Sequence, residues 1–134
     1  MHKKKPRSWS TLIIQGTSLK PDTVSRELGV SPDYSHDSNT TSLQDKQTMP
    51  IWQLNSRLKP DATLSEHLWD ILERIAPARK LLKEWSQEME IVLYTSVEFS
   101  DADVDGIKLE PRLMLLLGDL GIHLEFLPWL EESA

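Results

Sequence analysis

The sequence has no cysteine, only five glycines and no long apolar run, and each shortage excludes a class of protein. Without cysteine there is no disulfide framework, thiolate metal site or cysteine nucleophile. No stretch of about 18 apolar residues is present, so a transmembrane helix is not expected. The glycines are scattered, which excludes a glycine-rich phosphate-binding loop.

The first ten residues, MHKKKPRSWS, are basic but lack the apolar stretch and the cleavage site of a secretory signal. Together with the absence of cysteine, this favours a cytoplasmic protein. At 134 residues, 39% of them hydrophobic and 27% charged, the chain has the size of one soluble domain. We expect residues 1–8 to be a flexible basic tail, residues 9–129 to form the domain, and residues 130–134 to be a C-terminal tail.

Charge is unevenly distributed along the chain. The first seven residues contain no acid and four basic side chains, Lys3, Lys4, Lys5 and Arg7. The remaining 127 residues therefore have 11 basic against 21 acidic side chains, a net charge of −10. Because duplex affinity depends mainly on clustered Lys and Arg that neutralise phosphates, this acidic body is not expected to bind nucleic acid. Only the basic tail could contact phosphate.

Four segments have the composition or the alternating pattern of strands. Residues 9–15 and 50–57 are rich in β-branched or aromatic side chains, and residues 90–99 alternate cleanly between two faces. Residues 122–129 close the chain with a further apolar alternation. These patterns predict four strands.

Three segments have apolar side chains at helical spacing, namely residues 19–30, 63–89 and 111–120. Pro77 interrupts the second segment, so that helix either kinks or restarts there, because an internal proline removes a hydrogen bond and clashes with the preceding turn. Residues 31–48 contain few large apolar groups and are predicted to be a mobile polar loop.

The order β-α-β-α-β-α-β predicts an α+β fold. We expect a two-layer α/β sandwich in which about four largely antiparallel strands carry three helices on one face. The other face of the sheet is expected to be more polar.

Three stretches carry a family resemblance: LIIQGTSLKPDTVSRELGVSP, WQLNSRL and GIKLEPRLMLLLGDLGIHLEF. In this order and spacing they resemble the bacterial family named domain of unknown function 4279, over roughly Leu12 to Phe126. The resemblance implies a small α/β domain of bacterial or phage type, and it supplies no established catalytic residues. The sequence departs from the family pattern in the long polar loop before Trp52, in DADVDG and in the tail LPWLEESA.

The strand at residues 50–57 presents a row of polar side chains on one side. The first interpretation is that this row is the solvent-exposed face of a half-buried strand. The alternative is a hydrogen-bonding platform for a partner, joined by residues from neighbouring strands, since Tyr, Trp and Arg are enriched at protein interfaces. The candidate partner-binding residues are Trp52, Gln53, Asn55, Arg57, Tyr94 and His123.

The segment DADVDG has the opening pattern of a calcium loop. Asp101, Asp103 and Asp105 stand at alternate positions before Gly106, so their carboxylates could converge on a hard cation. The twelfth position of such a loop should be a bidentate Glu, and here it is Arg112. A solvated acidic turn is therefore the preferred interpretation.

Two other groups of residues are weaker candidates for a functional site. Asp33, His36 and Asp37 mix an imidazole with carboxylates and could ligate a transition metal, but they fall in the predicted mobile loop. A Ser-His-Asp triad could be assembled around His67 or His123, yet no motif such as G-x-S-x-G supports it.

We carry two functional hypotheses from this sequence. The first is a non-enzymatic interaction module that binds another protein, as an immunity protein or antitoxin binds a basic toxin, because the acidic body would steer a basic partner. The second is a ligand- or calcium-responsive domain that uses the Asp101–Asp105 loop or the polar sheet face. No cofactor, membrane association or enzymatic activity is expected, and self-association is left open.

Overall fold

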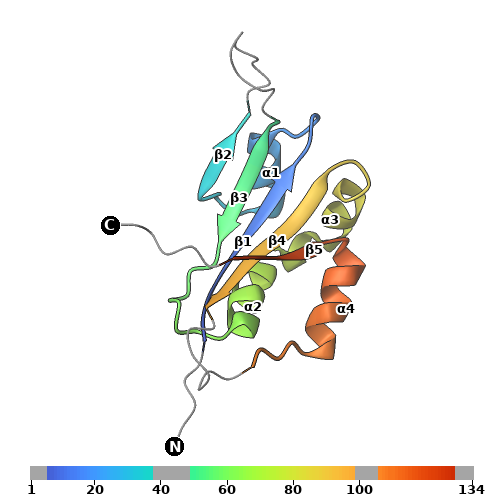
Figure 1. The fold of residues 1–134 in the computed structure, drawn as a ribbon. Coiled ribbons are helices and arrows are strands. Elements are labelled where there is room, and N and C mark those ends of the chain that lie inside the picture. Colours follow the sequence, from blue (N-terminus) through green and yellow to red (C-terminus); the bar gives the residue numbers. More distant parts are fainter. Residues whose placement is uncertain (1–5, 38–48, 99–105, 129–134) are drawn as a thin grey trace, which may run out of the picture.

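The computed structural model describes residues 6–37, 49–98 and 106–128, and these residues form one sheet with helices on one side (Figure 1). The strands are β1 (Arg7–Gln15), β2 (Tyr34–His36), β3 (Ile51–Asn55), β4 (Glu90–Glu98) and β5 (His123–Leu127). The helices are α1 (Pro21–Leu28), α2 (Leu64–Ile75), α3 (Arg79–Trp85) and α4 (Pro111–Leu120). In these parts of the chain, every helix is too short or too polar to cross a membrane.

The sheet has the strand order β2-β3-β1-β4-β5, with β1 at its centre. Neighbouring strands are antiparallel except β4 and β5, which are parallel. Parallel neighbours need a crossover connection, and α4 lies in the segment that makes it. The predicted α+β class is confirmed, although the sheet has five strands rather than about four.

The structure has strand residues in two places where none was predicted. The additional strand, β2, lies inside the segment predicted as a loop. There Tyr34 pairs with Gln53 and His36 with Ile51. Three residues are too few to show an alternating pattern. The strand can be recognised only from its pairing with the edge of β3. The first strand also begins earlier than predicted, because Arg7 pairs with Glu98 and extends the ladder into the predicted tail.

The hydrophobic core lies between the sheet and the helices. Strands β1, β3 and β4 contribute alternate residues to it, as the period of two requires. Fully buried members include Leu12 and Ile14 of β1, Trp52 of β3, and Leu93 of β4. Helix α2 supplies the opposite wall with these residues: Leu64, Leu68, Ile71, Leu72 and Ile75.

The helical region after β3 is two helices. The side chain of Thr63 accepts a hydrogen bond from the backbone of Glu66, whose carboxylate accepts one from the backbone of Thr63, so α2 begins with a capping box. Pro77 stands in a short 3-10 turn, Ala76–Ala78, labelled η1, after which α3 begins. Of the two outcomes predicted at this proline, a restart is the one observed.

Candidate functional site

The side of the sheet that carries no helix, called here the open face, is built from alternate residues of all five strands (Figure 1). Residues directly opposite on adjacent strands point to the same side, so the strand register fixes which side chains are neighbours. One row runs across the whole sheet, in the order Tyr34, Gln53, Ile13, Val92 and His123. Gln53 and His123 therefore belong to the same row, although 70 positions separate them in the sequence.

A second row lies beside the first and begins at β3, with Asn55, Thr11, Tyr94 and Glu125 in order. The side chains of Asn55 and Tyr94 are half-buried, and Glu125 is exposed. Four of the six predicted partner-binding residues thus lie on the open face: Gln53, Asn55, Tyr94 and His123.

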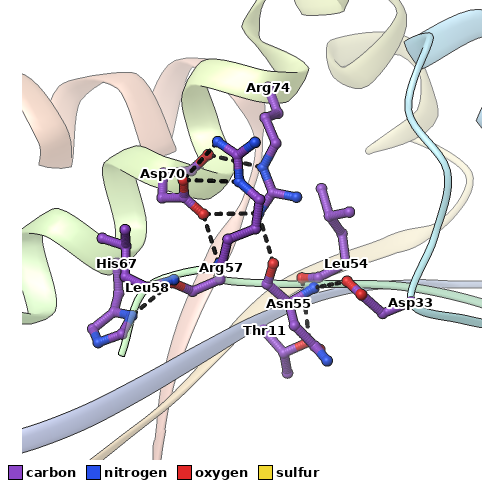
Figure 2. Close-up of polar contacts among 10 residues, drawn as sticks. Thr11, Asp33, Leu54, Asn55, Arg57, Leu58, His67, Asp70 and Arg74 are labelled. Atoms are coloured by element: carbon purple, nitrogen blue, oxygen red, sulfur yellow. Dashed lines mark hydrogen bonds and ion pairs between the residues drawn. The ribbon is translucent and has the colours of Figure 1, made fainter. Parts of the chain in front are cut away.

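Asn55 is held in place by hydrogen bonds from three directions (Figure 2). Its amide oxygen accepts from the hydroxyl of Thr11 at 2.5 Å and from the side-chain amide of Gln53 at 2.9 Å. Its backbone N–H donates to the carboxylate of Asp33 at 2.7 Å. Because both Asn55 and Gln53 already have partners within the sheet, this corner of the open face is a rigid platform.

The end of the open face formed by β4 and β5 is acidic. Burial raises the pKa of the Tyr94 hydroxyl, and the negative charges of Glu125 and Glu90 raise it further. Glu98 faces Arg7 at 3.5 Å, whereas no ion pair with Glu90 or Glu125 is found in the described ranges. Tyr94 therefore has one carboxylate, that of Glu125, directly beside it, and that of Glu90 further along the same face of β4.

Trp52 cannot belong to this surface, in contrast to the prediction. Its side chain is 0% exposed and points into the core on the helix-covered side of β3. The indole N–H donates to the hydroxyl of Ser25 in α1 at 3.0 Å. The alternation of the strand already placed it opposite Gln53, and it serves to join β3 to α1.

Arg57 was predicted to continue the polar row, but it turns away from the sheet. Strand β3 ends at Asn55, and the backbone N–H of Arg57 donates to the carboxylate of Asp70 in α2 at 2.8 Å. The guanidinium donates to the same carboxylate at 2.8 and 3.2 Å (Figure 2). Pairing with Asp70 thus replaces the ladder hydrogen bonds that would have kept Arg57 in line with Asn55.

Asp70 is the centre of this polar cluster. Arg74, one turn further along α2, donates to the Asp70 carboxylate at 2.9 Å and to the carbonyl of Asn55 at 2.6 Å. Burial by itself would raise the pKa of Asp70, but the hydrogen bonds from Arg57 and the charges of both arginines hold it below its usual value. The cluster therefore fastens the end of β3 to α2.

Sequence reasoning missed the contact between Ser56 and His67. The Ser56 hydroxyl lies 2.6 Å from Nδ1 of His67, whose side chain is almost fully buried. The backbone N–H of Leu58 donates to the same hydroxyl at 3.2 Å. One signal was available, since His67 lies on the apolar stripe of α2, between Leu64 and Leu68, where burial is expected.

This pair does not have the geometry of a nucleophilic site. A catalytic histidine must itself be oriented by a third group, and the nearby carboxylate of Asp70 is engaged with Arg57 and Arg74. A residue that is 1% exposed also cannot meet a substrate without rearrangement. Ser56 and His67 therefore form a structural hydrogen bond that joins the end of β3 to α2.

In the part of the chain that the structure describes, the remaining candidate ligand residues do not form a site. Asp101, Asp103 and Asp105 lie outside the described residues, as do Lys3, Lys4 and Lys5. Asp33 is bonded to the backbone of Asn55, and His36 lies in β2 on the open face. Across the ranges that the structure describes, no three His, Asp or Glu side chains cluster as metal ligands would.

Comparison with curated proteins and with solved structures gave no match. The family model described as "Domain of unknown function (DUF4279)" matches residues 6–131, which is nearly the whole chain and includes every strand and helix described above. The match agrees with the resemblance carried by the three stretches of sequence. The chain belongs to the DUF4279 family.

Proposed function

We propose that this protein is a non-enzymatic interaction module that binds a basic protein partner on the open face. The observation that carries the proposal is the sheet itself. Helices pack on one side (Figure 1), and the other side carries cross-strand rows in which polar and aromatic side chains lie around Ile13 and Val92. Rigid sheet faces suit recognition because their side chains are fixed before binding.

The chemistry of the β4–β5 end indicates a partner rich in Lys and Arg. Glu125 lies opposite Tyr94 on the neighbouring strand and offers a carboxylate acceptor next to an aromatic ring, and Glu90 lies on the same face of β4, four residues before Tyr94. A guanidinium or ammonium group placed there would gain charge-assisted hydrogen bonds and a cation–π contact. The partly exposed ring of Trp9, on the same face, offers a second aromatic contact.

Long-range charge supports the same partner. The chain beyond its first seven residues has a net charge of −10, which attracts a basic protein and raises the rate of encounter. An immunity protein or antitoxin that neutralises a basic toxin is the biological role that fits this chemistry.

The proposal can be tested with a charge-neutral variant of the open face. The immobilised protein is exposed to an extract of its source cells at low and high salt, and the bound proteins are identified. We expect a stoichiometric basic protein that is retained by the native chain, released at high salt, and retained poorly by Glu90→Gln/Glu125→Gln.

The matched control is Glu73→Gln/Glu84→Gln, which removes the same charge from exposed residues of α2 and α3, the helices on the other side of the sheet. It should retain the partner as the native chain does. Equal loss of the partner in both double variants, or retention by both, would contradict binding at the open face.

A further inference from the structure

The strand β5 leaves one edge of the sheet open. It pairs with β4 on one side, and none of the residues that the structure describes pairs with its other side. The opposite edge is β2, which has only three residues, whereas β5 has five. A row of unpaired backbone groups on an edge strand is a template for another strand, and short edges are one way in which proteins avoid this. The β5 edge lacks that protection.

Helix α4 presents an exposed apolar residue on its flank away from α3. Its Asp119 contacts Arg79 and Lys83 at 3.2 and 3.1 Å, so the Asp119 flank of α4 faces α3. Met114 lies about 140° from Asp119 on the helical wheel, at about 100° per residue, and its side chain is 52% exposed. Met114 therefore points away from α3.

Phe126 adds a second exposed apolar group at this edge. It follows Leu124 by two positions and so points to the helix-covered side of β5, yet it is 55% exposed. With Leu115 and Leu127, four of the large apolar side chains that the described structure leaves exposed belong to β5 and the helix that leads into it. The open face at this edge carries His123, Glu125 and the exposed Leu127.

We propose that a second copy of the chain binds here, by antiparallel pairing of the two β5 strands. Antiparallel pairing of identical strands has a two-fold axis perpendicular to the sheet, so every contact is made twice. Such an axis places the helices of both copies on the same side. The Met114 side chains of the two α4 helices then approach each other, and both exposed Phe126 side chains are covered.

The side chains of β5 select one register. With the axis at Leu124, His123 of each copy lies opposite Glu125 of the other, and Phe126 lies opposite Ile122. With the axis at Glu125, the two Glu125 carboxylates lie opposite each other. Like charges directly opposite are destabilising and a cation–carboxylate pair is favourable, so the axis at Leu124 is the preferred register.

This arrangement does not depend on the proposed function, but it has a consequence for it. The two open faces would lie on the same side of one continuous sheet. A partner with two basic sites could then bind both copies, with an avidity greater than either single contact provides.

Association is measured first, with the full native chain, by analytical ultracentrifugation over a range of concentrations. We expect a monomer–dimer equilibrium that Met114→Lys and Phe126→Lys each weaken by about tenfold or more, as loss of a central apolar contact does. The matched control is Leu58→Lys, since Leu58 is also exposed, at 39%, but follows β3. A monomer at every concentration, or equal weakening by the control, would overturn the proposal.

The register is tested separately by cross-linking, for which the absence of cysteine is an advantage. Side chains directly opposite on antiparallel strands have Cβ atoms about 4.5–5.5 Å apart, close to the spacing of a disulfide. Under oxidising conditions Leu124→Cys should form a covalent dimer rapidly and Glu125→Cys slowly. Faster cross-linking of Glu125→Cys, or none with either variant, would overturn the register proposed here.

Discussion

The hydroxyl of Ser56 lies 2.6 Å from Nδ1 of His67, and this contact ties the residue after β3 to the buried side of α2. Because the hydroxyl accepts from the backbone of Leu58, its own hydrogen is free to point at His67. Nε2 of His67 is buried and has no hydrogen-bond partner in the described residues, so adding a charge to this ring would be costly.

The first prediction concerns acid stability. Burial lowers the pKa of His67 below its ordinary value of 6.5, although the charges of Asp70 and Glu66 partly oppose this. Between the folded and the unfolded pKa the unfolded chain binds more protons, so the free energy of unfolding must fall as the pH drops below about 6.5. Urea unfolding of the native chain at pH 8, 6.5 and 5.5 should show this loss.

The control for this prediction is His67→Asn, which keeps an acceptor near Ser56 but cannot be protonated. It should be less stable than the native chain at pH 8 and should lose less stability between pH 8 and pH 5.5. A native chain and variant with parallel pH dependence would show that His67 does not cause the loss.

The second prediction concerns the cluster around Asp70. Asp70→Asn should lower the free energy of unfolding by roughly 1.5–3 kcal/mol, because the lost carboxylate accepts charge-assisted hydrogen bonds and Arg74 is mostly buried beside it. Arg57→Gln should cost less, since Asp70 keeps Arg74 and the backbone N–H of residue 57. Chemical denaturation at pH 7 compares the two, and a larger loss in the arginine variant would contradict this assignment.

The third prediction uses the glycines as a matched series. Gly121 has φ of 73°, and a Cβ there would lie 2.6 Å from the Cβ of Ser86, so Gly121→Ala should cost more than the roughly 1–2 kcal/mol of the left-handed conformation alone. Gly29, with φ of 70° and open space around it, should show only the conformational cost. Gly118 lies within α4 with nothing near, and Gly118→Ala should stabilise by up to about 1 kcal/mol. Thermal unfolding measurements should rank the three variants from most to least stable as Gly118→Ala, Gly29→Ala and Gly121→Ala.

The fourth prediction separates a core tryptophan from a surface one. Trp52→Ala should lower the free energy of unfolding by about 3–5 kcal/mol, because the side chain is fully buried and the Ser25 hydroxyl loses its partner. Trp9, which is 37% exposed on the open face, should cost less than half as much when replaced by Ala. If the partner is lost with Trp9→Ala while the fold persists, the ring contributes to binding.

Much of the fold follows from local patterns. The alternation of residues 90–99 predicted which side of β4 is buried, and Ile91 and Leu93 are indeed in the core. The helical spacing over residues 63–89 predicted the start of α2, where Thr63 and Glu66 form the capping box. Strand β2 was missed because its three residues have no pattern of their own and become a strand only by pairing with β3.

The candidate site was predicted only in part. Gln53, Asn55, Tyr94 and His123 lie on one face because strand alternation fixes direction, but their order in rows depends on register, which no single strand contains. Arg57 departs from the row because Asp70, in a different element, provides a stronger set of hydrogen bonds.

The sequence by itself determined the periodicities, the helix ends and the acidic balance of the chain, since each depends on residues close together or on composition alone. Only the tertiary structure decided that β5 lies at the open edge beside β4, that Ser56 meets His67, and that Asp70 gathers Arg57 and Arg74. Those contacts join residues that lie apart in the chain, and they form only when burial of the shared core brings the sheet and α2 together.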